Sequence, residues 1–113
     1  MARADRLERL DAQRLALEAE YREFLTEALR ATAGGRWGLF GHNEQPGKGS
    51  PPAEVEHLLE LGEAIASMRE RLLLEPFALH GEFLASRGRV KSDAVGEPKQ
   101  AQAWLDRLTK AES

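Results

Sequence analysis

The stretch GGRWGLFGHN, residues 34–43, interrupts a sequence that otherwise strongly favours helix. It places Trp37, Leu39 and Phe40 among four glycines. A solvated linker has no need of large apolar side chains, so these residues either close the protein's own core or contact a partner. The residues that follow, EQPGKGSPP at 44–52, have the composition of a mobile linker instead. We therefore expect only the first half of this loop to be ordered.

The segment before the loop predicts one long amphipathic helix over residues 3–33. It contains neither Gly nor Pro, and strong helix formers dominate it. Such a helix is about 46 Å long, whereas a compact chain of this length is roughly 34 Å across. Its first turns, around Leu7 and Leu10, are therefore expected to project into solvent, to fray or to pack on a second copy. The apolar side chains recur at spacings of three, four and seven, which places them along one face: Leu7, Leu10, Leu17, Tyr21, Phe24, Leu25, Ala28 and Leu29.

Three further helices are predicted after the loop at 34–51. Proline stands at or near the start of each, where a first helical turn tolerates its missing N–H. No segment alternates apolar and polar residues in the manner of a half-buried strand. The fold class predicted for residues 1–113 is all-α, a single domain formed by a small antiparallel helical bundle. The three helices are expected at residues 52–75, 77–87 and 98–111.

Composition excludes several classes of site and partner. The chain has no cysteine, which rules out disulfides, thiolate nucleophiles and cysteine-ligated zinc or iron–sulfur centres. Its formal charge of −3 opposes general attraction to nucleic acid and to anionic lipid. No apolar run reaches the roughly 20 residues of a membrane span, and the first residues do not read as a signal peptide. We therefore expect a cytoplasmic protein with no membrane partner.

One basic cluster, formed by Arg87, Arg89 and Lys91, would carry any contact with nucleic acid. Asp93 and Glu97 follow closely and offset its charge, and no known DNA-binding motif accompanies it. Nucleic acid is therefore the least favoured of the partner hypotheses.

Sequence motifs for catalysis and for metal binding are incomplete. PGKGS, at residues 46–50, has some features of a phosphate-binding loop, but its glycine spacing is wrong and no strand precedes it. Glu54 and His57 have the Glu-x-x-His spacing of di-iron bundles, but the second such motif is missing. His80 is best interpreted as a hydrogen-bonded imidazole at the edge of the core. We therefore predict no catalytic residue, no metal site and no cofactor.

The aromatic half of the loop carries the main functional hypothesis. In a structural interpretation, its side chains fold back to seal the end of the bundle, and the glycines permit the tight path. In a functional interpretation, they form a binding hot spot, since Trp and Arg are enriched in such sites and loops often carry binding. Both interpretations hold if one aromatic points inward and the other outward. The candidate partner-binding residues are Arg36, Trp37, Leu39, Phe40, His42 and Asn43.

These observations lead to two hypotheses about function. The first is a small, soluble, non-enzymatic interaction module, an adaptor, inhibitor or assembly factor, which binds a protein partner or a second copy of itself. The alternative is a small-molecule-binding or enzymatic helical protein with a pocket beneath the same loop. That pocket would be lined by Tyr21, Phe24, Trp37 and His80.

Overall fold

The computed structural model describes residues 2–42, 52–88 and 96–112, and within these ranges the chain forms four helices and no strand. The predicted all-α class is therefore confirmed. Most of the linker at 44–52, together with Arg89 and Lys91, lies outside the described residues. The helices are α1 (Ala2–Ala33), α2 (Ala53–Arg71), α3 (Ala78–Ser86) and α4 (Glu97–Glu112).

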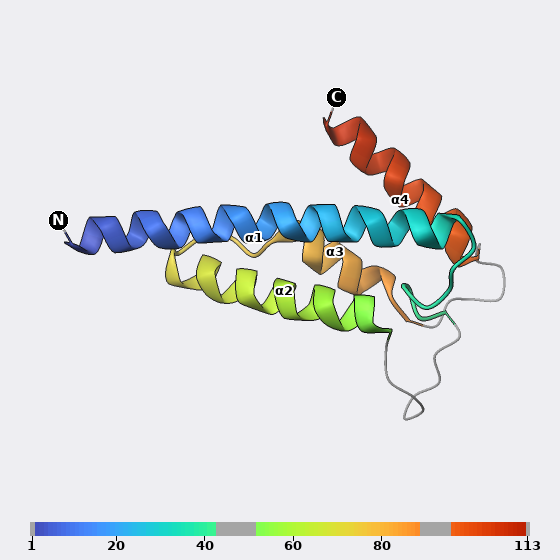
Figure 1. Cartoon of the computed structure of the whole chain (residues 1–113), viewed down its shortest axis with the longest axis horizontal. Helices are drawn as coiled ribbons and strands as arrows, with labels where there is room; N and C mark the ends of the chain where they lie inside the picture. The colour runs from blue at the N-terminus through green and yellow to red at the C-terminus, as the bar shows by residue number, and fades with distance from the viewer. Residues whose placement is uncertain (1, 43–51, 89–95, 113) are drawn as a thin grey trace.

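α1 is the longest helix, and both α2 and α4 pack against it. Its 32 residues span about 48 Å. α2 runs back beside α1 in the opposite direction, whereas α4 crosses the C-terminal end of α1 and leans away from the pair (Figure 1). The radius of gyration is 16.0 Å, compared with roughly 13 Å for a compact chain of this length. The molecule is elongated because the N-terminal turns of α1 extend past the end of α2 (Figure 1).

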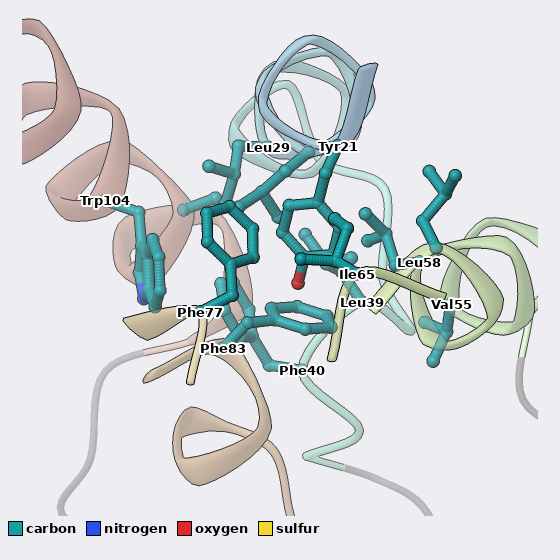
Figure 2. Close-up of a cluster of buried hydrophobic side chains, with 13 residues drawn as sticks. Tyr21, Leu29, Leu39, Phe40, Val55, Leu58, Ile65, Phe77, Phe83 and Trp104 are labelled. Atoms are coloured by element: carbon teal, nitrogen blue, oxygen red, sulfur yellow. The ribbon is translucent and has the colours of Figure 1, made fainter. Parts of the chain in front are cut away.

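The hydrophobic core lies where the four helices and the aromatic loop meet (Figure 2). Phe40, from the loop, is fully buried, and its ring centroid lies 6.3 Å from that of Phe83 and 6.5 Å from that of Trp104. The loop therefore supplies core side chains that the short helices α3 and α4 do not. The other buried hydrophobic residues are Tyr21, Leu25, Leu29, Leu39, Val55, Leu58, Leu61, Ile65, Phe77 and Ala101.

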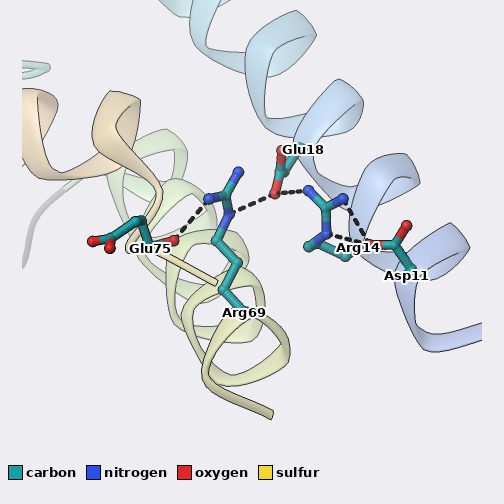
Figure 3. Close-up of polar contacts among 5 residues, drawn as sticks. All are labelled: Asp11, Arg14, Glu18, Arg69 and Glu75. Carbon is teal, nitrogen blue, oxygen red and sulfur yellow. Dashed lines mark hydrogen bonds and ion pairs between the residues drawn. The ribbon is translucent and has the colours of Figure 1, made fainter. Parts of the chain in front are cut away.

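A polar network joins α1 to α2 where the apolar stripe is interrupted by Arg14 (Figure 3). Arg14 contacts Asp11 at 2.7 Å and Glu18 at 2.8 Å, and Arg69 of α2 contacts the same Glu18 oxygen at 2.7 Å. Burial raises the pKa of Glu18, but hydrogen bonds from Arg69 and Arg14 outweigh that effect and hold the pKa below its ordinary value. Arg69 also donates to the backbone oxygen of Glu75. At this level, α1 and α2 are therefore joined by the ion pair of Glu18 with Arg69.

The predicted end of the second helix, near Glu75, is wrong, because α2 ends at Arg71. Leu73 adopts a left-handed conformation with φ 58°, and no glycine marks this position in the sequence. The Leu74 N–H donates to the oxygen of Arg69 at 2.8 Å, and the Leu73 N–H donates to that of Glu70 at 3.1 Å. These two bonds form a Schellman motif, which stops the helix before Pro76 is reached.

Candidate interaction surface

The aromatic loop begins where α1 ends, and glycines determine its path. Gly35, Gly38 and Gly41 have φ values of 118°, 120° and 68°, in the region that favours glycine. The N–H groups of Gly34 and Arg36 donate to carbonyls of the last turn of α1. The chain thus reverses direction tightly, and residues 37–40 return beside the end of α1 and the start of α2.

The carboxylate of Glu97 anchors this loop from the first residue of α4. Glu97 is only 1% exposed, and both of its carboxylate oxygens accept hydrogen bonds. The Phe40 N–H donates to one carboxylate oxygen at 2.8 Å, and the Gly38 N–H donates to both oxygens, at 3.1 and 3.2 Å. Hydrogen bonds to a charged acceptor are the stronger kind, so these contacts hold the loop backbone in one conformation.

Other contacts hold the loop from the end of α3 and from α4. The Arg87 side chain donates to the oxygen of Leu39, and the Gly88 N–H donates to the oxygen of Phe40, both at 2.8 Å. His42 is hydrogen-bonded to Gln100 of α4. The loop is therefore fixed through its backbone by residues from two separate segments, as a pre-organised binding loop would be.

The candidate partner-binding residues separate into a buried and an exposed group. Leu39 is 5% exposed and Phe40 is 0% exposed, so both belong to the core. Trp37 is 48% exposed, and the Arg36 side chain is 64% exposed. His42 is partly buried, and Asn43 lies outside the described residues. The structural interpretation therefore holds for the adjacent residues Leu39 and Phe40, whereas Arg36 and Trp37, which precede them, stay at the surface.

The surroundings of Trp37 hold its indole ring in place while leaving one side of it open. A Cβ at Gly96 would lie 3.3 Å from the indole Cη2 atom, so the ring packs on the bare backbone there. The ring also meets His42 edge-on, with centroids 6.1 Å apart. Beside it, the Arg36 guanidinium forms a 2.6 Å ion pair with Glu54 of α2. The exposed surface therefore combines the indole ring of Trp37 with the guanidinium of Arg36, which is ion-paired with Glu54.

A small pocket lies next to this surface, between the last turns of α1, the loop and the start of α2. Its volume of about 20 Å³ is room for roughly one water molecule. Pockets for small organic ligands are typically about 300–1,000 Å³. This pocket is therefore too small to hold a drug-sized ligand. Its lining residues are Ala28, Ala31, Thr32, Arg36, Trp37, Leu39, Pro52, Glu54 and Val55.

The four residues proposed for that alternative pocket occupy different environments. Tyr21 and His80 do meet, with Oη and Nδ1 2.6 Å apart, and the Tyr21 side chain is fully buried. Burial raises the pKa of Tyr21, so its hydroxyl remains protonated and can donate to the imidazole. Phe24 packs instead on His57, with centroids 4.5 Å apart, and Trp37 packs on Gly96.

The His80 ring fits against α2 because Gly62 has no side chain, and a Cβ there would overlap the ring. Burial lowers the pKa of His80, an effect that nearby Glu63 partly opposes. The imidazole is therefore neutral near pH 7, and its hydrogen bond to Tyr21 is an internal contact between α1 and α3.

Sequence reasoning missed the residue that organises the loop. Glu97 was interpreted as a charge that offsets the cluster around Arg87, whereas its carboxylate is buried on loop N–H groups and Arg87 itself donates to Leu39. An acidic residue just before Pro98, in the first turn of α4, was the only local signal. Glu54, which the sequence relates to His57 by its Glu-x-x-His spacing, pairs with Arg36. These pairings connect residues far apart in sequence, so spacing rules do not reveal them.

Comparison with known proteins gives no match to a family model, to a curated protein or to a solved structure. Over the ranges that the structure describes, no group of three or more acidic or histidine side chains is placed to hold a metal ion. Over the same ranges, no helix combines the length and the apolar character needed to cross a membrane.

Proposed function

We propose that this protein is a non-enzymatic interaction module that binds a protein partner through Trp37 and Arg36. The observation that carries the proposal is a half-exposed tryptophan on a loop whose backbone is fixed by a buried carboxylate. Trp and Arg are the residues most enriched in binding hot spots, and pre-organisation reduces the entropy lost when a partner binds.

The division of the loop supports the proposal. Leu39 and Phe40 fasten the loop to the core, which leaves Trp37 free to serve as the anchor for a partner. Glu54 holds Arg36 beside the indole ring through an ion pair that is itself partly exposed, at 30% for the glutamate side chain. A partner carboxylate placed over this surface could compete for Arg36 while an apolar group covers the ring.

The experiment places a photo-crosslinking amino acid at position 37 of the full chain in its native host, with position 84 as the matched control. Leu84 is 44% exposed, close to the value for Trp37, but it lies on α3. Crosslinked proteins are identified by mass spectrometry, and the partner found at position 37 is then purified. We expect that partner to be absent from the crosslinks formed at position 84.

Binding is then measured with the purified partner and with Trp37→Ala, Arg36→Gln and Leu84→Ala. Truncation of a hot-spot tryptophan reduces the binding free energy by at least about 2 kcal/mol, so Trp37→Ala should weaken binding roughly thirtyfold or more. Arg36→Gln should weaken it less, and Leu84→Ala should leave it unchanged. Equal binding by Trp37→Ala and the unsubstituted protein would reject the proposal, as would a bound small molecule that native mass spectrometry detects and that Trp37→Ala loses.

A further inference from the structure

The N-terminal arm of α1, residues 5–13, carries a second unpaired apolar surface at the other end of the molecule. Leu7 and Leu10 continue the stripe that packs Leu17 and Tyr21 onto the core. Leu7 is 47% exposed, because α2 has 19 residues against 32 in α1 and ends before this level. In Figure 1 the arm extends past the last turn of α2. Leu7 is thus left largely uncovered, and Leu10 is only partly buried.

A groove of about 390 Å³ lies between this arm and the end of α2. Its lining consists of two leucines, one glutamine and three arginines, with no carboxylate among them. Glu8 lies about 160° around the helix from Leu10 and so faces away from the groove. Asp5 lies about 140° from Leu10 but only about 40° from Arg9, one turn before it, so it offsets part of the charge of Arg9 and leaves Arg6 and Arg71 without an acidic residue in the lining. The lining residues are Arg6, Leu7, Arg9, Leu10, Gln13 and Arg71.

The arginines that line this groove differ from the neighbouring arginines in their ion pairing. Arg14 and Arg69, slightly further along the helices, are both paired with Glu18. None of the ion pairs found among the described residues involves Arg6, Arg9 or Arg71. On a protein of net charge −3, a groove lined by two leucines and three arginines is locally basic, and an acidic partner with apolar side chains is complementary to it.

We propose that this groove binds an acidic amphipathic helix from a different protein. The leucines would receive apolar side chains at helical spacing, and the arginines would face carboxylates on the flanks of the incoming helix. A second copy of this chain is a poorer occupant, because a two-fold interface apposes the same patch on both subunits and would bring arginines together. The groove lies at the opposite end of α1 from Trp37, so this binding is separate from that of the proposed function.

Leu73, two residues beyond Arg71, contributes to the same end of the molecule. Its side chain is 93% exposed although its backbone is in the left-handed region. A leucine there is strained and buries almost nothing within the chain, so the fold gains little from it.

The test uses the full chain and two labelled synthetic peptides of about 18 residues, five helical turns. Both have Leu at spacings of three and four; one has Glu and the other has Lys at the flanking positions. Fluorescence anisotropy measures binding at about 50 mM and about 300 mM salt, on either side of physiological screening. We expect the Glu peptide to bind at least about tenfold more tightly than the Lys peptide, with affinity falling as salt rises.

Two sets of substitutions locate the site, and a third serves as the control. Arg6→Gln, Arg9→Gln and Arg71→Gln together, or Leu7→Ser with Leu10→Ser, should each weaken the Glu peptide at least about tenfold. The control combines Leu15→Ser and Arg30→Gln, which lie elsewhere on α1 and are exposed. Circular dichroism confirms that each variant keeps its helical content.

Four outcomes would overturn the proposal. They are equal binding of the Glu and Lys peptides, no binding of the Glu peptide at about 1 mM, a concentration-dependent dimer that the arm substitutions abolish, and binding to anionic lipid vesicles that the same substitutions abolish. Loss of Glu-peptide binding in Trp37→Ala would also contradict the separation of the two surfaces. Failure of the Trp37 experiment alone would leave the groove proposal standing.

Discussion

Removing the Glu97 carboxylate tests whether this single side chain organises the aromatic loop. In Glu97→Ala, the N–H groups of Gly38 and Phe40 lose their acceptor, and that of Phe40 is buried. A hydrogen bond to a charged acceptor contributes about 1.5–3 kcal/mol. Two such bonds amount to roughly 3–6 kcal/mol, from which the desolvation of the lost carboxylate must be subtracted. We expect a net loss of about 3–4 kcal/mol in the free energy of unfolding.

Thermal and urea unfolding measure this loss, with Glu82→Ala as the matched control. Glu82 is a helical glutamate of α3 that pairs with Arg107 at 3.0 Å, and both side chains are more than half exposed. Its removal should change stability by less than about 1 kcal/mol. At roughly 4 °C per kcal/mol for a chain of this size, Glu97→Ala should lower Tm by about 12–16 °C. Glu97→Gln keeps one acceptor oxygen and should fall between the two.

Amide hydrogen exchange provides a local readout that global stability does not supply. The Gly38 and Phe40 amides should lose protection in Glu97→Ala to a greater extent than amides of α1 and α2. An organising role for Glu97 is excluded if the free energies of unfolding of Glu97→Ala and Glu82→Ala agree within about 1 kcal/mol and the two loop amides keep their protection. In that case the backbone contacts from the end of α3 would suffice to hold the loop.

Three further outcomes are expected. Phe40→Ala should lower the free energy of unfolding by about 3–5 kcal/mol and Trp37→Ala by only about 1–2 kcal/mol, because only Phe40 is fully buried; equal losses in urea unfolding would contradict the division of the loop. Burial depresses the pKa of His80 below its ordinary 6.5. The neutral His80 side chain therefore contributes fully to the free energy of unfolding above about pH 6.5, and this contribution is lost as the pH falls towards the lower folded-state pKa. Urea unfolding from pH 7.5 to about 4.5 should therefore show a steeper decline in the unsubstituted protein than in His80→Gln, and parallel curves would exclude this role. Leu73→Gly should raise stability by about 0.5–1 kcal/mol, since glycine adopts φ 58° without strain, and a lower Tm would contradict the assignment of strain.

Local sequence signals determined the helices and the class of the fold. Periodic leucines, the absence of Gly and Pro before residue 34, and prolines at helix starts all act within a few residues, which is why they can be interpreted without a structure. The projection of α1 also follows from length alone, because a helix of this size is longer than the compact globule that the chain can form. The end of α2 was predicted too late because a leucine, not a glycine, adopts the left-handed position.

The division of the aromatic loop was decided by tertiary structure. GGRWGLFGHN indicates that large side chains sit on a flexible backbone, but the direction in which each one points depends on partners about 60 residues away. Glu97 binds the N–H groups on either side of Leu39, and this contact turns Phe40 into the core and leaves Trp37 at the surface. The arginine-bordered groove has the same origin, since Arg6, Arg9 and Arg71 meet only when α2 packs antiparallel to α1. Sequence determines which segments are helical through short-range forces, whereas hydrogen bonds and charges between distant segments decide which side chains remain available for binding.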